Sequence, residues 1–213
     1  ESKLSGAAQS CAVFDGDGNC VDFVSRQEYV EIKNVPENLK NSFIAIEDKR
    51  FYTHNGVDYR SMLRATKNNF FSGKIKEGAS TISQQLVKNA FLSGEKTLNR
   101  KLCEIKLARQ LEKRYSKNEI LEMYLNKIYF GNGAYGVAAA AKTYFGKTTE
   151  ELTLSECATL AAVVKAPASY DPYSYADKCK NRRNLVLKEA FSQGYINESD
   201  YGDAVKRDLT LKT

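Results

Sequence analysis

The spacing of the apolar residues changes near residue 36. Before that point, two short alternating runs at 12–14 and 21–24 flank a glycine-rich turn, which predicts a β-hairpin. Beyond it, apolar positions recur every three or four residues, as at Leu39, Phe43 and Ile46, which is typical of amphipathic helices. The same spacing predicts further helices at 59–71, 81–92, 97–114, 117–128, 137–145, 154–165, 176–193 and 198–207. We therefore expect a mainly α fold, with a small N-terminal β-hairpin and linker in residues 1–35 and one domain in residues 36–213.

Some helix ends are marked by known signals. Ser116-x-x-Glu119 and Thr153-x-x-Glu156 are capping-box patterns that precede apolar runs. Gly146 and Gly194 stand where helix C-terminal caps belong.

The composition is that of a globular protein. The chain has 213 residues, 42% of them hydrophobic and 27% charged, which excludes collagen-like and disordered chains. No apolar run approaches the ~18 residues that span a bilayer, and the given sequence does not start with a signal-peptide pattern. Five cysteines without a CxxC pair argue against a structural zinc site, and a Cys11–Cys20 disulfide across the hairpin is left open.

The net charge of +6 is unevenly distributed. Arg60 to Lys117 holds 14 Lys/Arg and four Glu, a net charge of +10, so the rest of the chain carries −4. Such a block favours an anionic partner, which could be nucleic acid, anionic lipid or a phosphorylated substrate; the alternative is a solvated helical surface. Within it, residues 62–76 mix apolar and basic side chains, which suits either a shallow membrane contact or a core-facing amphipathic helix.

Glu47 is a candidate general base. It stands at the C-terminal end of an apolar helix, where the helix dipole disfavours an extra negative charge. The alternative is a surface acid paired with Lys49 or Arg50. His54 is the chain's one histidine, so a histidine-based metal site is not expected, and a hydrogen-bonded structural role is favoured over catalysis.

A polar stripe follows on the helix expected at 81–92. Thr81, Gln85 and Lys88 share one face, opposite an apolar stripe that begins with Ile82 and Leu86. Hydroxyl, amide and ammonium donors suit phosphate or sugar oxygens, with a solvated polar face as the alternative.

Glu104 is a second candidate carboxylate. Arg100 and Lys101 precede it by one helical turn and would keep it ionised, with simple intrahelical ion pairs as the alternative. Two carboxylates in different environments make a plausible acid/base pair. On the same helix, we expect Leu98, Leu102 and Ile105 to form the buried face.

Taken in order, these segments resemble the peptidoglycan glycosyltransferases (glycosyltransferase family 51), the polymerase module of class A penicillin-binding proteins. The resemblance covers residues 30–205. The matching motifs are Glu47-Asp-x-x-Phe-x-x-His-x-Gly56, Gly78-x-Ser-Thr-Ile-x-Gln-Gln85, Lys88-Asn89, Arg100-Lys-x-x-Glu104, Lys117-x-Glu-Ile-Leu-Glu-x-Tyr-Leu-Asn126, Gly133-Ala-Tyr-Gly-Val137, Tyr144-Phe-Gly-Lys147 and Lys165-x-Pro-x-x-Tyr-x-Pro172.

The resemblance implies a lysozyme-like glycosyltransferase fold and a hexosyltransferase that polymerises lipid II into glycan strands with inversion. Glu47 would be the catalytic base and Glu104 the second catalytic carboxylate. The residues implied in pyrophosphate and sugar binding are Thr81, Gln85, Lys88, Asn89, Lys96, Arg100 and Lys101. Many relatives carry Arg at position 96 and a basic residue at position 103, so these two places depart from the family pattern.

The resemblance also implies cofactors and partners. A divalent metal, Mg²⁺ or Mn²⁺, is expected at Glu104 together with substrate phosphates, and no organic cofactor is expected. The partners would be lipid II, the growing glycan chain, the membrane surface and a fused transpeptidase domain, but not nucleic acid. The enzyme would act on the outer face of a bacterial cytoplasmic membrane, anchored by a transmembrane helix outside the given sequence.

Two other functions are open at this point. A lysozyme-like hydrolase or lytic transglycosylase would share the fold and one glutamate, but would not need the cationic cluster. A basic membrane-binding module would need no catalytic residue at all.

Overall fold

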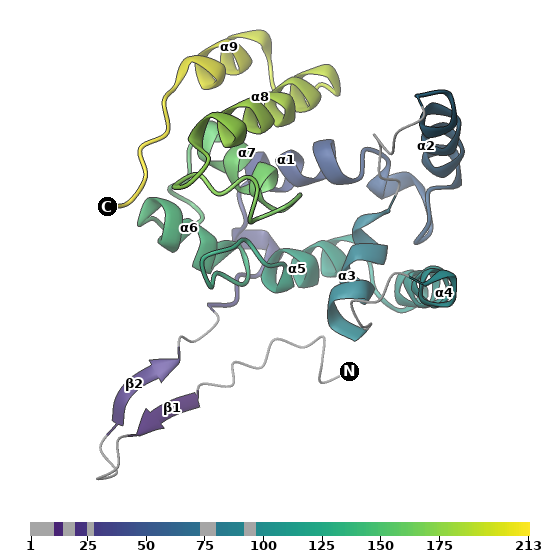
Figure 1. Cartoon of the computed structure of the whole chain (residues 1–213), viewed down its shortest axis with the longest axis horizontal. Helices are drawn as coiled ribbons and strands as arrows, with labels where there is room; N and C mark the ends of the chain where they lie inside the picture. The colour runs from purple at the N-terminus through teal and green to yellow at the C-terminus, as the bar shows by residue number, and fades with distance from the viewer. Residues whose placement is uncertain (1–10, 15–19, 25–27, 73–79, 92–96) are drawn as a thin grey trace.

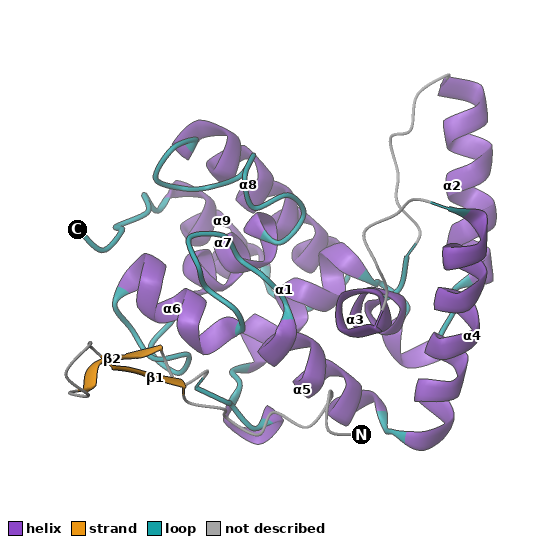
Figure 2. Ribbon diagram, turned by 60° about the horizontal axis from the view of Figure 1, so that its bottom comes forward, coloured by secondary structure: helices purple, strands orange, loops and turns teal. Residues whose placement is uncertain are grey.

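The computed structural model describes residues 11–14, 20–24, 28–72, 80–91 and 97–213. Within these ranges the chain is mainly helical, as predicted, and every expected helix is present with ends within two residues of the expected bounds (Figures 1 and 2). The helices are α1 Glu37–Glu47, α2 Tyr59–Ser72, α3 Ile82–Phe91, α4 Leu98–Arg114, α5 Lys117–Lys127, α6 Val137–Phe145, α7 Leu154–Val163, α8 Ala176–Ser192 and α9 Glu198–Lys206.

Two short strands precede the helices. β1 Cys11–Phe14 and β2 Cys20–Val24 pair antiparallel, with Cys11 opposite Val24 and an irregular register between Val13 and Phe14. The side chains of Cys11 and Cys20 lie outside the described part of the structure, and so does the disulfide that the sequence left open.

The predicted helix ends are confirmed. Both capping boxes form, with Ser116 and Thr153 each accepting from the backbone N–H three residues on. Gly146 caps α6 in the left-handed conformation, and Gly194 adopts a φ of +77° just after α8. Glycine readily adopts the left-handed conformation that ends a helix, so a glycine at these two places predicts the helix end from the sequence.

The core surrounds α7. Its residues from Ser155 to Val163 are all buried, including the polar Glu156 and Thr159. It packs against α1, α6, α8 and α9, whereas α3 packs against α4 and α5. The C-terminal end of α1 therefore reaches the place where these two groups of helices meet (Figure 1).

The predicted buried face of α4 is wrong for two of its three residues, and the third, Ile105, is half-buried. Leu98 is 86% and Leu102 is 65% exposed, and the buried positions of α4 are instead Glu104, Ala108 and Leu111. The first turns of α4 therefore present these two leucines to solvent, while Arg100 and Lys101 on the same turns are half-buried. Among the described residues, no helix is both long and apolar enough to cross a bilayer.

Candidate active site

Glu47 is the last residue of α1, and the buried apolar face of that helix fixes its position. Its Oε2 accepts a hydrogen bond of 2.8 Å from Nε2 of Gln85 on α3. Gln85 is in turn held by the hydroxyl of Tyr124, which lies 3.2 Å from its Oε1. The second oxygen of Glu47, Oε1, is buried and has no hydrogen-bond partner among the described residues. One carboxylate oxygen is thus fixed and the other is free to accept a proton.

Tyr124 forms the floor beneath this carboxylate. It is fully buried, and burial raises the pKa of its hydroxyl well above the ordinary value, with the nearby charges of Glu47 and Asp48 adding to the effect. The Tyr124 hydroxyl therefore stays protonated and remains a hydrogen-bond donor to Gln85 at any physiological pH.

Two cavities meet at Glu47. Cavity A, of about 520 Å³, extends along α3 past Gln85, Lys88 and Asn89. Cavity B, of about 540 Å³, extends toward α2 and α8. The residues that line both cavities are Ile46, Glu47, Ser80, Lys165 and Arg182. A carboxylate at the junction of two cavities can contact two bound molecules at once.

The predicted pair of Glu104 with Arg100 and Lys101 is present on α4. Arg100 Nη1 lies 3.0 Å from Glu104 Oε2, and Lys101 Nζ donates to Glu104 Oε1. Glu104 is 2% exposed and lines neither cavity. Instead, Lys101 Nζ also donates a 3.0 Å hydrogen bond to the hydroxyl of Ser80, which lines both cavities. Glu104 therefore contacts the site only indirectly, through the Lys101 ammonium group that it binds.

These contacts decide whether Glu104 has a free oxygen for the expected divalent metal. Both oxygens of Glu104 are already used by cationic side chains, and the described part of the chain holds no group of three His, Cys, Asp or Glu side chains suited to a metal ion. A divalent cation held by protein ligands does not fit this arrangement, because it would have to displace a cationic partner of Glu104.

The polar stripe of α3 divides between two tasks. Gln85, Lys88 and Asn89 line cavity A, and their role in binding stays a prediction. Thr81 lines cavity B, but its hydroxyl is occupied: it donates to the carbonyl of Gly56 at 2.7 Å and accepts from the backbone N–H of Gln84. The Gln84 side chain accepts from the N–H of Thr81 in return, so this pair is a capping box.

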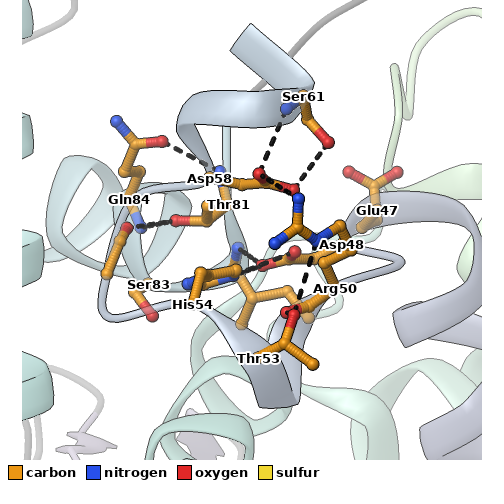
Figure 3. A network of polar contacts seen from close by, with 12 residues as sticks. Glu47, Asp48, Arg50, Thr53, His54, Asp58, Ser61, Thr81, Ser83 and Gln84 are labelled. Carbon is orange, nitrogen blue, oxygen red and sulfur yellow. Dashed lines mark hydrogen bonds and ion pairs between the residues drawn. The ribbon is translucent and has the colours of Figure 1, made fainter.

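Of the other residues noted in the sequence, His54 has a defined position in the structure. His54 has the structural role that was favoured, since it is buried and bonded to Asp48 (Figure 3). Lys96 lies outside the described residues, so its role stays a prediction.

Sequence reasoning missed several cavity residues. Lys165 and Arg182 line both cavities, and the guanidinium of Arg182 lies 5.9 Å from the ring centre of Tyr170. Tyr129 and Tyr135 line cavity A, with ring centres 4.7 Å apart. Lys165 and Tyr135 belong to motifs already noted, but no spacing rule joins them to α3, because only the tertiary fold brings them to the cavity that α3 also lines.

Comparisons with known proteins agree with this arrangement. Residues 18–191 match the transglycosylase family. The chain is 46% identical over 206 residues to penicillin-binding protein 1A of Aquifex aeolicus, covering 96% of the chain and 28% of that protein. It is 45% identical over 191 residues to penicillin-binding protein 1A of Escherichia coli, covering 89% of the chain and 22% of that protein. The chain thus spans about a quarter of the length of these relatives.

One solved structure is also similar. The crystal structure of penicillin-binding protein 1A from Haemophilus influenzae superposes with a TM-score of 0.56 at 28% identity, covering 96% of the chain and 21% of that protein. The predicted mainly α, lysozyme-like fold is confirmed by this match.

Proposed function

The chain belongs to the transglycosylase family, and from this premise we propose that it polymerises lipid II into the glycan strands of peptidoglycan. The observation that carries the proposal is the position of Glu47 at the junction of cavities A and B. A polymerase that joins two lipid-linked saccharides needs one carboxylate within reach of both. A glycan hydrolase also binds sugar on both sides of the bond that it cleaves, but its leaving group is a sugar and does not need fixed cations such as Lys88 in cavity A.

Glu47 is the catalytic base in this proposal. Its free Oε1 removes the proton from the 4-hydroxyl of the acceptor, and Gln85 holds Oε2 so that the free oxygen keeps its direction. The acceptor oxygen forms a bond to the anomeric carbon of the donor, the bond from that carbon to the pyrophosphate oxygen breaks, and the configuration inverts. The bonding electrons leave with the lipid pyrophosphate.

The leaving group carries its charge toward the cations of α3 and α4. Lys88 lines cavity A, and Lys101 reaches the same wall through Ser80. We therefore assign the donor pyrophosphate to cavity A and the acceptor to cavity B. Fixed cations stabilise a pyrophosphate anion without a proton transfer, which makes general acid catalysis unnecessary here. Glu104 acts by holding Arg100 and Lys101 in place.

A membrane location follows from the substrate's lipid. The end of the molecule formed by α2 and α4 (Figure 2) exposes large apolar side chains. Leu63 is 73% exposed, Leu98 86% and Leu102 65%. These leucines lie among basic residues of the +10 block, the combination that suits an anionic bilayer surface. We propose that this end rests on the outer face of the cytoplasmic membrane, and that in the full-length protein a transpeptidase domain is fused to this one.

The test is polymerisation of fluorescently labelled lipid II by the wild type and by Glu47→Gln. We expect long glycan strands from the wild type and a loss of at least 100-fold in rate for the variant. Glu37→Gln is the matched control, because Glu37 is an exposed carboxylate at the other end of the same helix, and it should polymerise at the wild-type rate.

Other outcomes would favour other functions. Shortening of preformed glycan without polymerisation would favour a hydrolase or lytic transglycosylase. Binding to anionic vesicles without any turnover would favour a membrane-binding module. An unchanged rate for Glu47→Gln would remove the base assignment.

A further inference from the structure

A short segment after α9 crosses the outside of the helical core. Residues 207–212, which we call the C-terminal strap, are neither helix nor strand, and they run from the end of α9 toward α6 (Figure 1). Leu209 and Leu211 of the strap pack against the core. The strap lines neither cavity A nor cavity B, yet side chains beside these cavities hold it at both of its ends.

Arg183 of α8 holds the start of the strap. Its side chain is fully buried, and its Nη1 donates to the carbonyl of Arg207 at 2.7 Å while its Nη2 donates to the carbonyl of Val205 at 3.0 Å. Its remaining N–H groups donate to the side-chain oxygens of Ser155 and Asn184. A guanidinium has five N–H donors in a rigid plane, and here each of them has an acceptor. The start of the strap is therefore fixed against α8.

Two tyrosines hold the other end of the strap. The backbone N–H of Lys212 donates to the carbonyl of Tyr144, the eighth residue of α6, at 2.8 Å. The hydroxyl of Tyr173 lies 2.9 Å from the carbonyl of Lys212 and 3.0 Å from the carbonyl of Thr143, so it bridges the strap and α6. The rings of Tyr144 and Tyr173 also lie side by side, with centres 5.7 Å apart.

Tyr144 continues this connection into the wall of cavity A. Its hydroxyl donates to the carbonyl of Phe130 at 2.7 Å and accepts from the side-chain amide of Asn132 at 3.3 Å. Burial raises the pKa of Tyr144 to about 12, so the hydroxyl stays protonated and keeps donating at physiological pH. Phe130 and Asn132 belong to the loop of residues 129–135, and the tyrosines at both ends of this loop line cavity A. The position of Tyr144 therefore affects the position of that loop.

We propose that the C-terminal strap positions the wall of cavity A for the donor, and that Tyr173 is the positioning residue that joins the strap to α6. The docked strap connects α8 to α6, because its start is bonded to Arg183 and its end to Tyr144. Arg182, the neighbour of Arg183 on α8, lines both cavities, so both attachments of the strap adjoin the site. The proposal rests on the assignment of the donor to cavity A in the proposed function.

The first test is amide hydrogen exchange without any substrate. The N–H of Lys212 reports the docked strap, and the N–H groups of Phe130 and Ala134 report the loop, where they donate to carbonyls at 2.9 Å and 2.8 Å. All three should be protected in the wild type. Tyr173→Phe removes one hydroxyl from a side chain that is 47% exposed, and we expect these amides to exchange about two- to tenfold faster, as the loss of one neutral hydrogen bond implies.

Tyr175→Phe is the matched control for this test. It removes a hydroxyl from an equally exposed tyrosine two residues further on, and exchange in the strap and the loop should match the wild type. An unprotected Lys212 amide in the wild type would overturn the proposal, because the strap would then not be docked. Faster exchange of Lys212 alone in Tyr173→Phe, with the loop unchanged, would also overturn it, because the strap would then not act on the loop.

The second test is the rate of lipid II polymerisation. Tyr173→Phe loosens the strap from α6 and Leu211→Ser loosens it from the core, and we expect each to lower kcat/KM about two- to tenfold at a temperature where both are folded. The double variant should be no slower than the slower single variant, because both changes undock the same strap. Tyr175→Phe should polymerise at the wild-type rate.

The possible results separate this proposal from the proposed function. Wild-type kcat/KM in folded Tyr173→Phe, or single effects that multiply in the double variant, would overturn the role of the strap while leaving the polymerase activity in place. If Leu211→Ser does not fold, the comparison of Tyr173→Phe with Tyr175→Phe decides. If the wild type makes no glycan, the proposed function fails, and hydrogen exchange still shows whether the strap holds the loop.

Discussion

Replacing Glu104 with glutamine tests whether a buried carboxylate that touches neither cavity supports catalysis by holding two cations. Glu104 bonds Arg100 through one oxygen and Lys101 through the other. The glutamine side chain is almost the same size but offers one acceptor oxygen and one amide that repels a cation. We expect Lys101 or Arg100 to lose its partner, and the contact between Lys101 and Ser80 to weaken.

The size of the effect follows from these contacts. A hydrogen bond to a charged group contributes about 1.5–3 kcal/mol, and the variant loses about one such bond. If that loss falls on stabilisation of the departing pyrophosphate, the expected fall in kcat/KM is roughly 10- to 150-fold. Because charge on the leaving oxygen grows toward the transition state, most of the loss should fall on kcat rather than on KM.

The assay is the initial rate of polymerisation at several lipid II concentrations. Cys103→Ser is the matched control, since Cys103 is an exposed neighbour on the same helix, and it should retain the wild-type rate. Thermal unfolding of each variant shows whether α4 remains folded. A folded Glu104→Gln with kcat/KM within twofold of the wild type would refute the role of Glu104 as holder of the cations.

Three further predictions concern the framework of the site. Gly56→Ala should lower the free energy of unfolding by about 2–4 kcal/mol and the melting temperature by roughly 5–15 °C, because residue 56 has a φ of +85° and its Cβ would lie 2.7 Å from a carbonyl oxygen of α4. Iodoacetamide at pH 8 should modify Cys103 but spare Cys157 and Cys179, because burial raises the pKa of both thiols to about 12; modification of either in native protein, read by mass spectrometry, would contradict this. Burial alone would raise the pKa of Asp58, but the hydroxyl and backbone N–H of Ser61, together with the electrostatic effects of Arg50 and His54, outweigh burial and hold the pKa below its ordinary value of 3.8. Asp58 therefore stabilises the fold above pH 3.8 and loses this effect as pH falls further, so the stability gap to Asp58→Asn in urea titrations should shrink below that pH.

The helices and the place of Glu47 at a helix end could be predicted from the sequence because both depend on local signals. A 3.6-residue period and capping residues act within one or two turns, and Glu47 stands at a helix end that the same period defines. The sequence also signals the capping box of α3, since Thr81-x-x-Gln84 matches the pattern. The Thr81 hydroxyl is therefore bonded to the start of α3.

The composition of the two cavities could not be predicted in this way. Lys165 and Arg182 approach Glu47 only because α7 and α8 pack against α1, and that packing depends on which apolar faces meet. A basic residue near the end of a helix gives no signal of the cavity it will line. The family resemblance identifies the motif that contains Lys165, but it does not show that Lys165 lines the same cavities as Glu47.

The wrong prediction for α4 has a physical reason that bears on function. Periodicity identifies the apolar side of a helix, and burial in the protein interior is only one way to keep that side from water. On α4 the first fully buried residue is Glu104, a charged residue held by its own cations, while Leu98 and Leu102 before it stay exposed. An enzyme of the proposed kind must take its substrate from a bilayer, and apolar side chains that face outward beside the pyrophosphate-binding cations would bring that surface to the cavity entrance. Substituting both leucines with serine should therefore weaken binding to anionic vesicles while leaving the melting temperature nearly unchanged, because neither side chain contributes to the core. A large fall in the melting temperature would instead mean that the original prediction of a buried face was right.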